Sequence, residues 1–251
     1  MRPQDEFDRV AELAAEGLSR SEISRRTGVP RLTVSGWLRD APPSHRVRAC
    51  NACGHAGHGI AWVDRAVYSY LLGMYLGDGH IARFSRAWCL RIVLDCRYPA
   101  IVAECVGAVQ AMVPRNAVGV IPHPTDNCVR VQAYSRGWPC LLPQHGPGRK
   151  HERPIVLTEW QLEITYAHPE HLIRGLIHSD GCRFVNRVRH GDKVYAYPRY
   201  MFSNRSRDIH GIFTDHLDRL GIAWRWSNDH TISIARREAV AKLDAFVGPK
   251  R

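Results

Sequence analysis

Two segments of the chain end in the same pair of residues. Each is an apolar, helix-compatible run: residues 71–79 close on Asp78-Gly79, and residues 173–181 close on Asp180-Gly181. An aspartate in the last turn of a helix opposes the helix macrodipole, whose C-terminal end is already negative, so it does not favour folding. The two aspartates therefore indicate a function. Two carboxylates held at one point would form a site for divalent cations.

Small residues spaced four apart are the feature that would bring these aspartates together. They form one stripe on each predicted helix and remove the side chains that would keep two helices apart. If the two stripes pack on each other, the acidic ends of the helices lie side by side. The stripes consist of Gly73 and Gly77 in the first helix, and of Gly175 and Ser179 in the second.

In these two motifs the chain resembles the LAGLIDADG homing endonucleases, in their single-chain form with two motifs. Asp78 and Asp180 match the metal-binding position of the family motif, and Gly73 and Gly175 match its packing glycine. The resemblance covers roughly residues 63–251.

Both copies of the motif depart from the family at the sixth position. This position is usually acidic, but Leu76 and His178 occupy it here. Because it is not the main metal-binding position, the departure weakens the resemblance only slightly.

The resemblance implies an α+β fold of two pseudo-symmetric lobes, each with the order αββαββα. We place lobe one at residues 63–155 and lobe two at residues 156–251. It also implies two motif helices at the lobe interface and a curved sheet in each lobe that lies over double-stranded DNA.

The residues support the same order of elements. After each motif come two strands, a helix, a second pair of strands and, in the second half, a short closing helix. In the second half we predict strands or helices at residues 182–189, 193–202, 209–220, 223–226, 231–236 and 240–246. In the first half we predict them at residues 81–85, 88–94, 101–112, 118–121 and 129–134.

The chemistry that the resemblance implies is the hydrolysis of DNA phosphodiesters with Mg²⁺. Two carboxylates can hold Mg²⁺ ions that activate water and stabilise the attacking and leaving oxygens. The family adds a lysine or polar residue to each site, and Lys150 is our candidate for the first half, with Gln144 weaker. Lys242 is the candidate for the second half.

Alternation along two predicted strands places polar side chains on one face. Arg130 and Gln132 share a face of the segment 128–134, and Arg183, Arg187 and Arg189 share a face of the segment 182–189. Arginine and glutamine on a sheet suit contacts to DNA phosphates and base edges. A charged, solvent-facing strand is the alternative for any single residue.

The composition agrees with a nucleic-acid partner. The chain has 251 residues, a net charge of +11 and a pI of about 9.6, which favours a polyanion. We expect no small-molecule substrate. With two lobes in one chain, we expect a monomer.

Hydropathy and cysteine spacing indicate the compartment. No apolar run approaches the length of a membrane span, and the 8 cysteines are scattered. We therefore expect no membrane association, reduced thiols and a cytoplasmic protein associated with the bacterial nucleoid.

The N-terminal residues 1–41 predict a helix-turn-helix domain. A capping box at Ser19–Glu22 starts a short helix, Gly28 ends it, and Pro30 opens the next. Such a domain places its last helix in the major groove of DNA. The candidate contacts of that helix are Arg31, Thr33, Ser35 and Arg39.

Residues 42–62 predict a linker that contains the spacing of a half zinc site. Cys50 and Cys53 could supply two thiolates. The other ligands stay open among His55, His58, His45 and a residue of the main domain. The alternative is a linker with two ordinary thiols.

Together these features predict a site-specific DNA endonuclease that makes metal-dependent double-strand breaks. The alternative is a transcriptional regulator that binds DNA through a LAGLIDADG-like domain without cleaving it. An endonuclease embedded in an intein fits poorly, because the chain has no N-terminal splicing residue and ends in Pro249-Lys250-Arg251.

Overall fold

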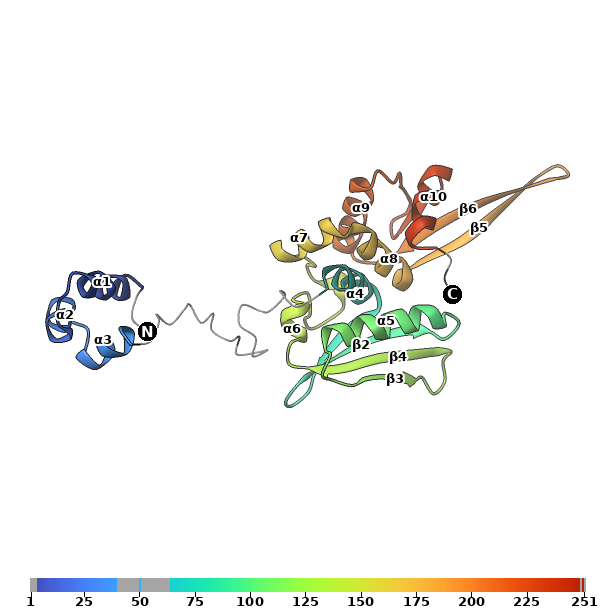
Figure 1. Cartoon of the computed structure of the whole chain (residues 1–251). Helices are drawn as coiled ribbons and strands as arrows, with labels where there is room; N and C mark the ends of the chain where they lie inside the picture. Colours follow the sequence, from blue (N-terminus) through green and yellow to red (C-terminus); the bar gives the residue numbers. More distant parts are fainter. Residues whose placement is uncertain (1–3, 40–49, 51–63, 249, 251) are drawn as a thin grey trace. The chain divides into compact units, whose positions relative to one another are not determined.

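The computed structural model describes residues 4–39, 50, 64–248 and 250 (Figure 1). The chain divides into two compact units, Met1–Ala49 and Cys50–Arg251. The predicted domain limits at residues 41/42 and 62/63 lie outside the described residues and stay predictions. Within the described part of the chain, no helix is both long and apolar enough to cross a membrane.

The first unit contains three short helices around a small apolar core. They are α1 (Gln4–Ala15), α2 (Arg20–Thr27) and α3 (Arg31–Trp37). The Ser19 hydroxyl caps α2 by accepting a hydrogen bond from the Glu22 amide at 3.3 Å. Gly28 ends α2 in the left-handed conformation, with φ of 70°. The core of this unit consists of Val10, Leu13, Ile23, Val29 and Val34.

The second unit repeats the order αββαββα twice. Lobe one contains α4 (Arg65–Asp78), β1 (Gly79–Arg83), β2 (Trp88–Asp95), α5 (Pro99–Met112), β3 (Val118–Pro122), β4 (Cys128–Ser135), α6 (Trp138–Leu141) and a 3-10 turn (Lys150–Glu152). Lobe two contains α7 (Glu159–Ala167), α8 (Pro169–Asp180), β5 (Gly181–His190), β6 (Lys193–Ser203), α9 (Arg207–Arg219), β7 (Arg225–Asn228), β8 (Thr231–Ile234) and α10 (Arg237–Phe246).

The two sheets share one topology. Sheet one has the order β1-β2-β4-β3, sheet two has the order β5-β6-β8-β7, and all described pairings are antiparallel. The predicted α+β class and the two-lobed αββαββα order are therefore confirmed. The helix α7, which precedes the second motif helix, was not predicted.

Sheet one buries one face and leaves the other open. Across β2 and β4, Ile92 pairs with Val131 and Leu90 with Ala133, and all four side chains are fully buried. The alternate residues, including Arg91 and its partner Gln132, lie on the opposite, open face.

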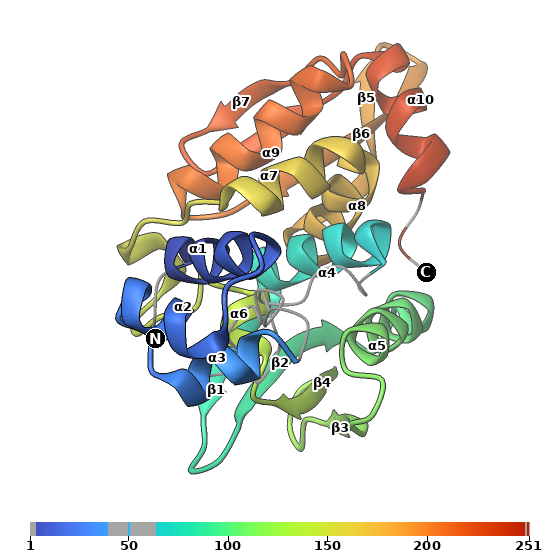
Figure 2. The ribbon, with the colours of Figure 1, turned by 60° about the vertical axis from the view of Figure 1, so that its left-hand side comes forward.

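The motif helices α4 and α8 pack against each other between the two sheets (Figure 2). A Cβ atom on Gly73 would collide with the carbonyl oxygen of Leu172, and one on Gly175 would collide with that of Tyr70. Only glycine allows the two backbones to approach so closely. The surrounding apolar side chains form one continuous core through both lobes.

This contact makes a stability prediction. Replacing Gly175 by alanine should lower the free energy of unfolding by roughly 1–3 kcal/mol or more, because the added methyl group meets backbone atoms that cannot move aside. Gly107→Ala is the matched control, since Gly107 is an exposed position within α5 where an added Cβ atom would meet nothing within 4 Å. Gly107→Ala should raise stability by about 0.5–1 kcal/mol. Urea unfolding measures both; equal effects of the two variants would contradict the close contact.

Candidate functional site

The two motif aspartates are the last residues of α4 and α8. Their helix ends nearly touch: a Cβ atom on Gly77 would collide with the Ser179 hydroxyl and would lie 3.1 Å from Asp180 Oδ2. The structure therefore brings Asp78, Gly77, Ser179 and Asp180 to one place.

Burial and mutual repulsion make this carboxylate pair costly to ionise. Burial, and secondly the charge of Asp180, raise the pKa of Asp78 to about 7. Burial also raises the pKa of Asp180, although a hydrogen bond from Asn204 Nδ2 at 2.6 Å opposes that shift. Both groups would be stabilised as anions by a bound cation. Carboxylate oxygens are ligands that Mg²⁺ prefers, so the two aspartates suit this ion.

A lysine lies at the end of each motif helix. Lys150 Nζ donates to the carbonyl oxygens of Tyr75, of Leu76 at 3.0 Å and of Gly77 at 2.8 Å. Lys250 Nζ donates to the carbonyl oxygens of His178 at 2.9 Å and Ser179 at 3.3 Å. Each ammonium group thus caps the negative end of a helix, next to its aspartate.

Burial lowers the pKa of Lys150 to about 8, while the charges of Asp180 and Asp78 oppose this shift. Burial also lowers the pKa of Lys250, against the charges of the same aspartates. The two ammonium groups therefore offset part of the negative charge that the aspartates bring into the interface.

The sequence identified one of these lysines and missed the other. Lys242, the candidate for lobe two, donates instead to the carbonyls of Leu220 and Gly221. Lys250 occupies the position equivalent to Lys150. The sequence does contain a signal, because the dipeptide Gly-Pro occurs just before each lysine, at 146–147 and at 248–249. The weaker candidate Gln144 is buried and bonded to Gln161.

The sixth positions of the motifs face the protein interior. Leu76 is fully buried, and the His178 ring accepts or donates a hydrogen bond with the Tyr70 hydroxyl at 3.1 Å. Burial, and secondly the Arg174 charge, lower the pKa of His178 to about 4, so the ring is neutral at pH 7. These residues pack the lobe interface, which explains how the motif tolerates non-acidic residues there.

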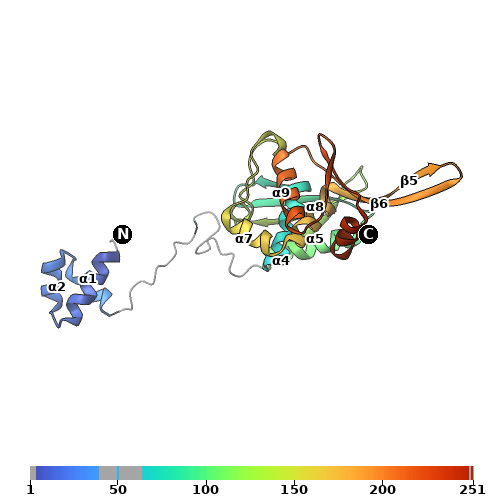
Figure 3. The ribbon, with the colours of Figure 1, turned by 90° about the horizontal axis from the view of Figure 1, so that it is seen from above.

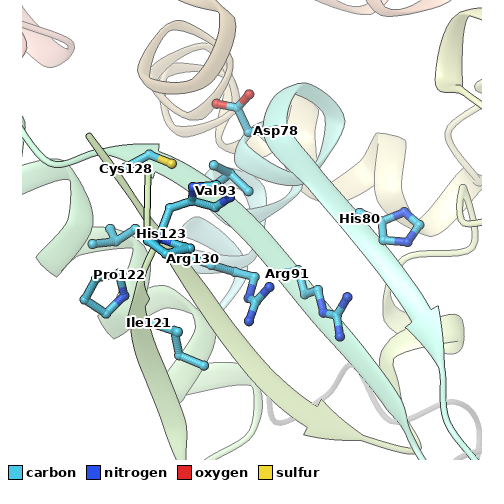
Figure 4. A pocket seen from close by; sticks show the side chains of 11 residues that line it. Asp78, His80, Arg91, Val93, Ile121, Pro122, His123, Cys128 and Arg130 are labelled. Atoms are coloured by element: carbon cyan, nitrogen blue, oxygen red, sulfur yellow. The ribbon is translucent and has the colours of Figure 1, made fainter. Parts of the chain in front are cut away.

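A cavity of about 470 Å³ opens between Asp78 and the open face of sheet one. Figure 4 shows Arg91 and Arg130 on neighbouring strands of this face, with Asp78 at the end of α4. The lining consists of Asp78, His80, Arg91, Val93, Ile121, Pro122, His123, Pro124, Cys128, Val129 and Arg130.

Several polar atoms on the open sheet faces have no partner. Among the described residues, the buried atoms Arg91 Nε, Arg130 Nε and Gln132 Oε1 of sheet one make no hydrogen bond, and neither does Arg199 Nε of sheet two. A buried donor or acceptor without a partner is unfavourable. The four side chains are half-buried on the open faces, so their exposed parts can contact a ligand that lies there. The sequence predicted Arg130 and Gln132 for this role but did not single out Arg91 or Arg199.

The sequence predicted Arg183 as a DNA contact, but the structure pairs its side chain with another residue of lobe two. Arg183 pairs across the sheet with Tyr200, on the buried face, and makes a bidentate ion pair with Asp244 of α10 at 2.7 and 2.8 Å. Its guanidinium group is thus engaged inside lobe two. Alternation correctly placed Arg187 and Arg189 on the same side of the strand as Arg183, but could not tell which side the helices cover.

Beyond the helices, β5 and β6 continue as a two-stranded arm (Figure 3). Arg187 and Arg189 are exposed on one side of it. Tyr195 and Tyr197 are exposed on the other side, with their rings stacked at a centroid distance of 6.3 Å.

The remaining candidates belong to other segments of the chain. In the first unit, Arg31 and Arg39 are exposed, whereas Thr33 and Ser35 are half-buried. Cys53 lies outside the described residues. One group of three metal-capable side chains exists within the described part of the chain: His123, Asp126 and Cys128, whose ligand atoms lie within 4.8 Å of one another. It lies at the β3–β4 turn.

No protein-family model matches this chain, and no curated protein matches its sequence. Solved structures do match in part. The "LAGLIDADG Meganuclease I-AabMI Bound to Uncleaved DNA" is 12% identical with a TM-score of 0.46, over 71% of this chain and 82% of that chain. I-DmoI in complex with DNA and Ca is 12% identical with a TM-score of 0.46, over 72% and 89%.

A third similar structure is full-length DUF199/WhiA from Thermatoga maritima. It is 13% identical with a TM-score of 0.46, over 74% of this chain and 56% of that chain. At this level of similarity, the case for a function rests on the residues of this chain.

The raised pKa of Asp78 predicts how stability depends on pH without metal. Between about pH 4 and pH 7 the folded protein keeps a proton that the unfolded chain has lost, so stability falls as pH rises through this range. The loss should be on the order of 3 kcal/mol. In EDTA, Asp78→Asn should remove most of this slope and be more stable than the parent above pH 7. Urea unfolding at several pH values checks this.

The control for this prediction is Asp215→Asn, because Asp215 is half-exposed and paired with Arg219 at the surface. It should leave the slope unchanged. An Asp78→Asn variant with the slope of the parent would show that Asp78 titrates normally.

Proposed function

We propose that this protein is a metal-dependent endonuclease that cleaves both strands of double-stranded DNA. One observation carries the proposal: two half-buried carboxylates, one from each lobe, meet at the ends of two helices, and each has its own lysine. Folding alone does not favour acidic residues at these positions. A site for cations at the centre of a basic surface explains them.

Asp78 and Asp180 would hold Mg²⁺ ions, which supply an activated water and neutralise charge on the reacting phosphate. The protein's own residues orient this centre. Asn204 fixes the carboxylate of Asp180, and the close contact of α4 with α8 fixes both aspartates relative to each other. Lys150 and Lys250 place positive charge beside the aspartates, where negative charge accumulates in the transition state.

The pseudo-symmetry supports cleavage of both strands. Each lobe contributes one aspartate, one lysine and one open sheet face, so two equivalent half-sites lie about the lobe interface. Because one chain supplies both, the protein would act as a monomer. The arrangement fits two phosphates on opposite strands of one duplex.

The open sheet faces are the proposed DNA-binding surface. Their half-buried polar side chains, Arg91, Arg130, Gln132 and Arg199, can bind phosphates or base edges. The exposed Arg187 and Arg189 extend this basic surface along the arm. In this proposal the protein is associated with the nucleoid in the cytoplasm.

A regulator that binds DNA without cleaving it is the second candidate. The observation that favours it is the three-helix unit, which exposes Arg31 on its third helix and Arg39 just after that helix. Under this proposal the aspartates would bind a cation only to assist DNA binding.

A cleavage assay distinguishes the two candidates. Incubated with a library of DNA sites and Mg²⁺, the full chain should produce double-strand breaks, which EDTA abolishes. Asp78→Asn and Asp180→Asn should each reduce cleavage at least about 100-fold, because each removes a charged metal ligand. DNA affinity measured in Ca²⁺ should change little. Asp215→Asn is again the control and should cleave like the parent. Selective binding without any cleavage by the parent would favour the regulator.

A second prediction concerns the binding surface. Arg130→Gln should weaken DNA binding and reduce the slope of log affinity against log salt by about 1, if Arg130 contacts a phosphate. Arg219→Gln is the matched control, because Arg219 is bound to Asp215 and stacked on Tyr166 instead. Fluorescence anisotropy at several salt concentrations measures both. Equal slopes for parent and Arg130→Gln would exclude this phosphate contact.

A further inference from the structure

Two cysteines far apart in the sequence meet in the second unit. Cys50 precedes α4, Cys140 lies in α6, and their sulfur atoms are 3.7 Å apart across 90 positions of sequence. Two thiolates on one tetrahedral zinc ion lie about 3.8 Å apart, because each Zn–S bond is about 2.3 Å long. A disulfide needs about 2.05 Å. The observed separation is too long for a disulfide, and it fits either a thiol–thiol hydrogen bond or two ligands of one metal ion.

The position of Cys140 is fixed by its neighbours in α6. Trp138 is fully buried, and its indole N–H donates to the Ala133 carbonyl at 2.9 Å. The Leu141 carbonyl accepts a hydrogen bond from the Tyr68 hydroxyl at 2.6 Å. Two anchors within one short helix hold the thiol in place before any metal binds, which lowers the cost of ordering a ligand.

We propose that Cys50 and Cys140 are two ligands of a structural zinc ion that ties the segment before α4 to lobe one. Thiolates are the preferred ligands of structural zinc, and such sites have four ligands. The sequence predicted a half-site of Cys50 and Cys53 and left the other ligands open, with a residue of the main domain among the alternatives. Cys140 is such a residue.

Such an ion would hold Cys50 against α6 of lobe one. This site is independent of the proposed cleavage chemistry.

Elemental analysis of the purified, reduced full chain tests the proposal. The parent should retain about one equivalent of zinc at this site. Cys140→Ser and Cys50→Ser should each lose this equivalent, whereas Cys128→Ser should keep it. Cys128 belongs to the other metal-capable group, so this control separates the two places. Cys50 precedes the first helix of its unit, so its replacement leaves the core of the lobes intact.

Cobalt substitution provides a second readout. Co²⁺ bound by thiolates gives an intense near-ultraviolet charge-transfer band, which should appear in the parent and weaken in Cys140→Ser. Two results would overturn the proposal: zinc retained by Cys140→Ser as by the parent, or a zinc-free parent. A zinc-free parent with a Cys50–Cys140 disulfide, found by mass spectrometry, would identify the pair as a redox link instead.

Discussion

The close approach of α4 and α8 is the constraint on which the rest of the second unit depends. Gly73 and Gly175 leave no room for a side chain where each faces the backbone of the other helix. This contact sets the relative position of the lobes, since the core runs through it without interruption. It also fixes where the helices end. The acidic ends meet because the glycines lie at the same distance from the aspartate in both helices.

This arrangement places two carboxylates close together in a half-buried site. The two halves of the chain stabilise their carboxylates differently. Asn204 donates to Asp180 and opposes the rise in its pKa that burial causes, whereas burial and the charge of Asp180 raise the pKa of Asp78 to about 7. The pair therefore titrates as one coupled system. The two lobes are alike in backbone, but they are not equivalent in electrostatics.

The sequence predicted the parts of the fold that repeat and missed those that do not. The Asp-Gly motifs and the alternating strands recur in both halves, so each copy supports the other. The role of Lys250 was not predicted, because only the dipeptide Gly-Pro marks its position in the sequence. In the structure Lys250 caps α8 as Lys150 caps α4. Arg183 shows a different limit. Alternation assigns residues to two faces, but only the packing of α10 decides which face is buried, and Asp244 binds Arg183 there.

The lysines and the aspartates differ in their hydrogen bonds at the helix ends. Each lysine binds carbonyl oxygens that would otherwise be unsatisfied. Burial lowers the pKa of both lysines and raises the pKa of both aspartates, so each of these charges has a cost in the metal-free fold. Asparagine would satisfy the same positions without charge. A cation bound between the two acids, as proposed above, would return the free energy that their burial removes.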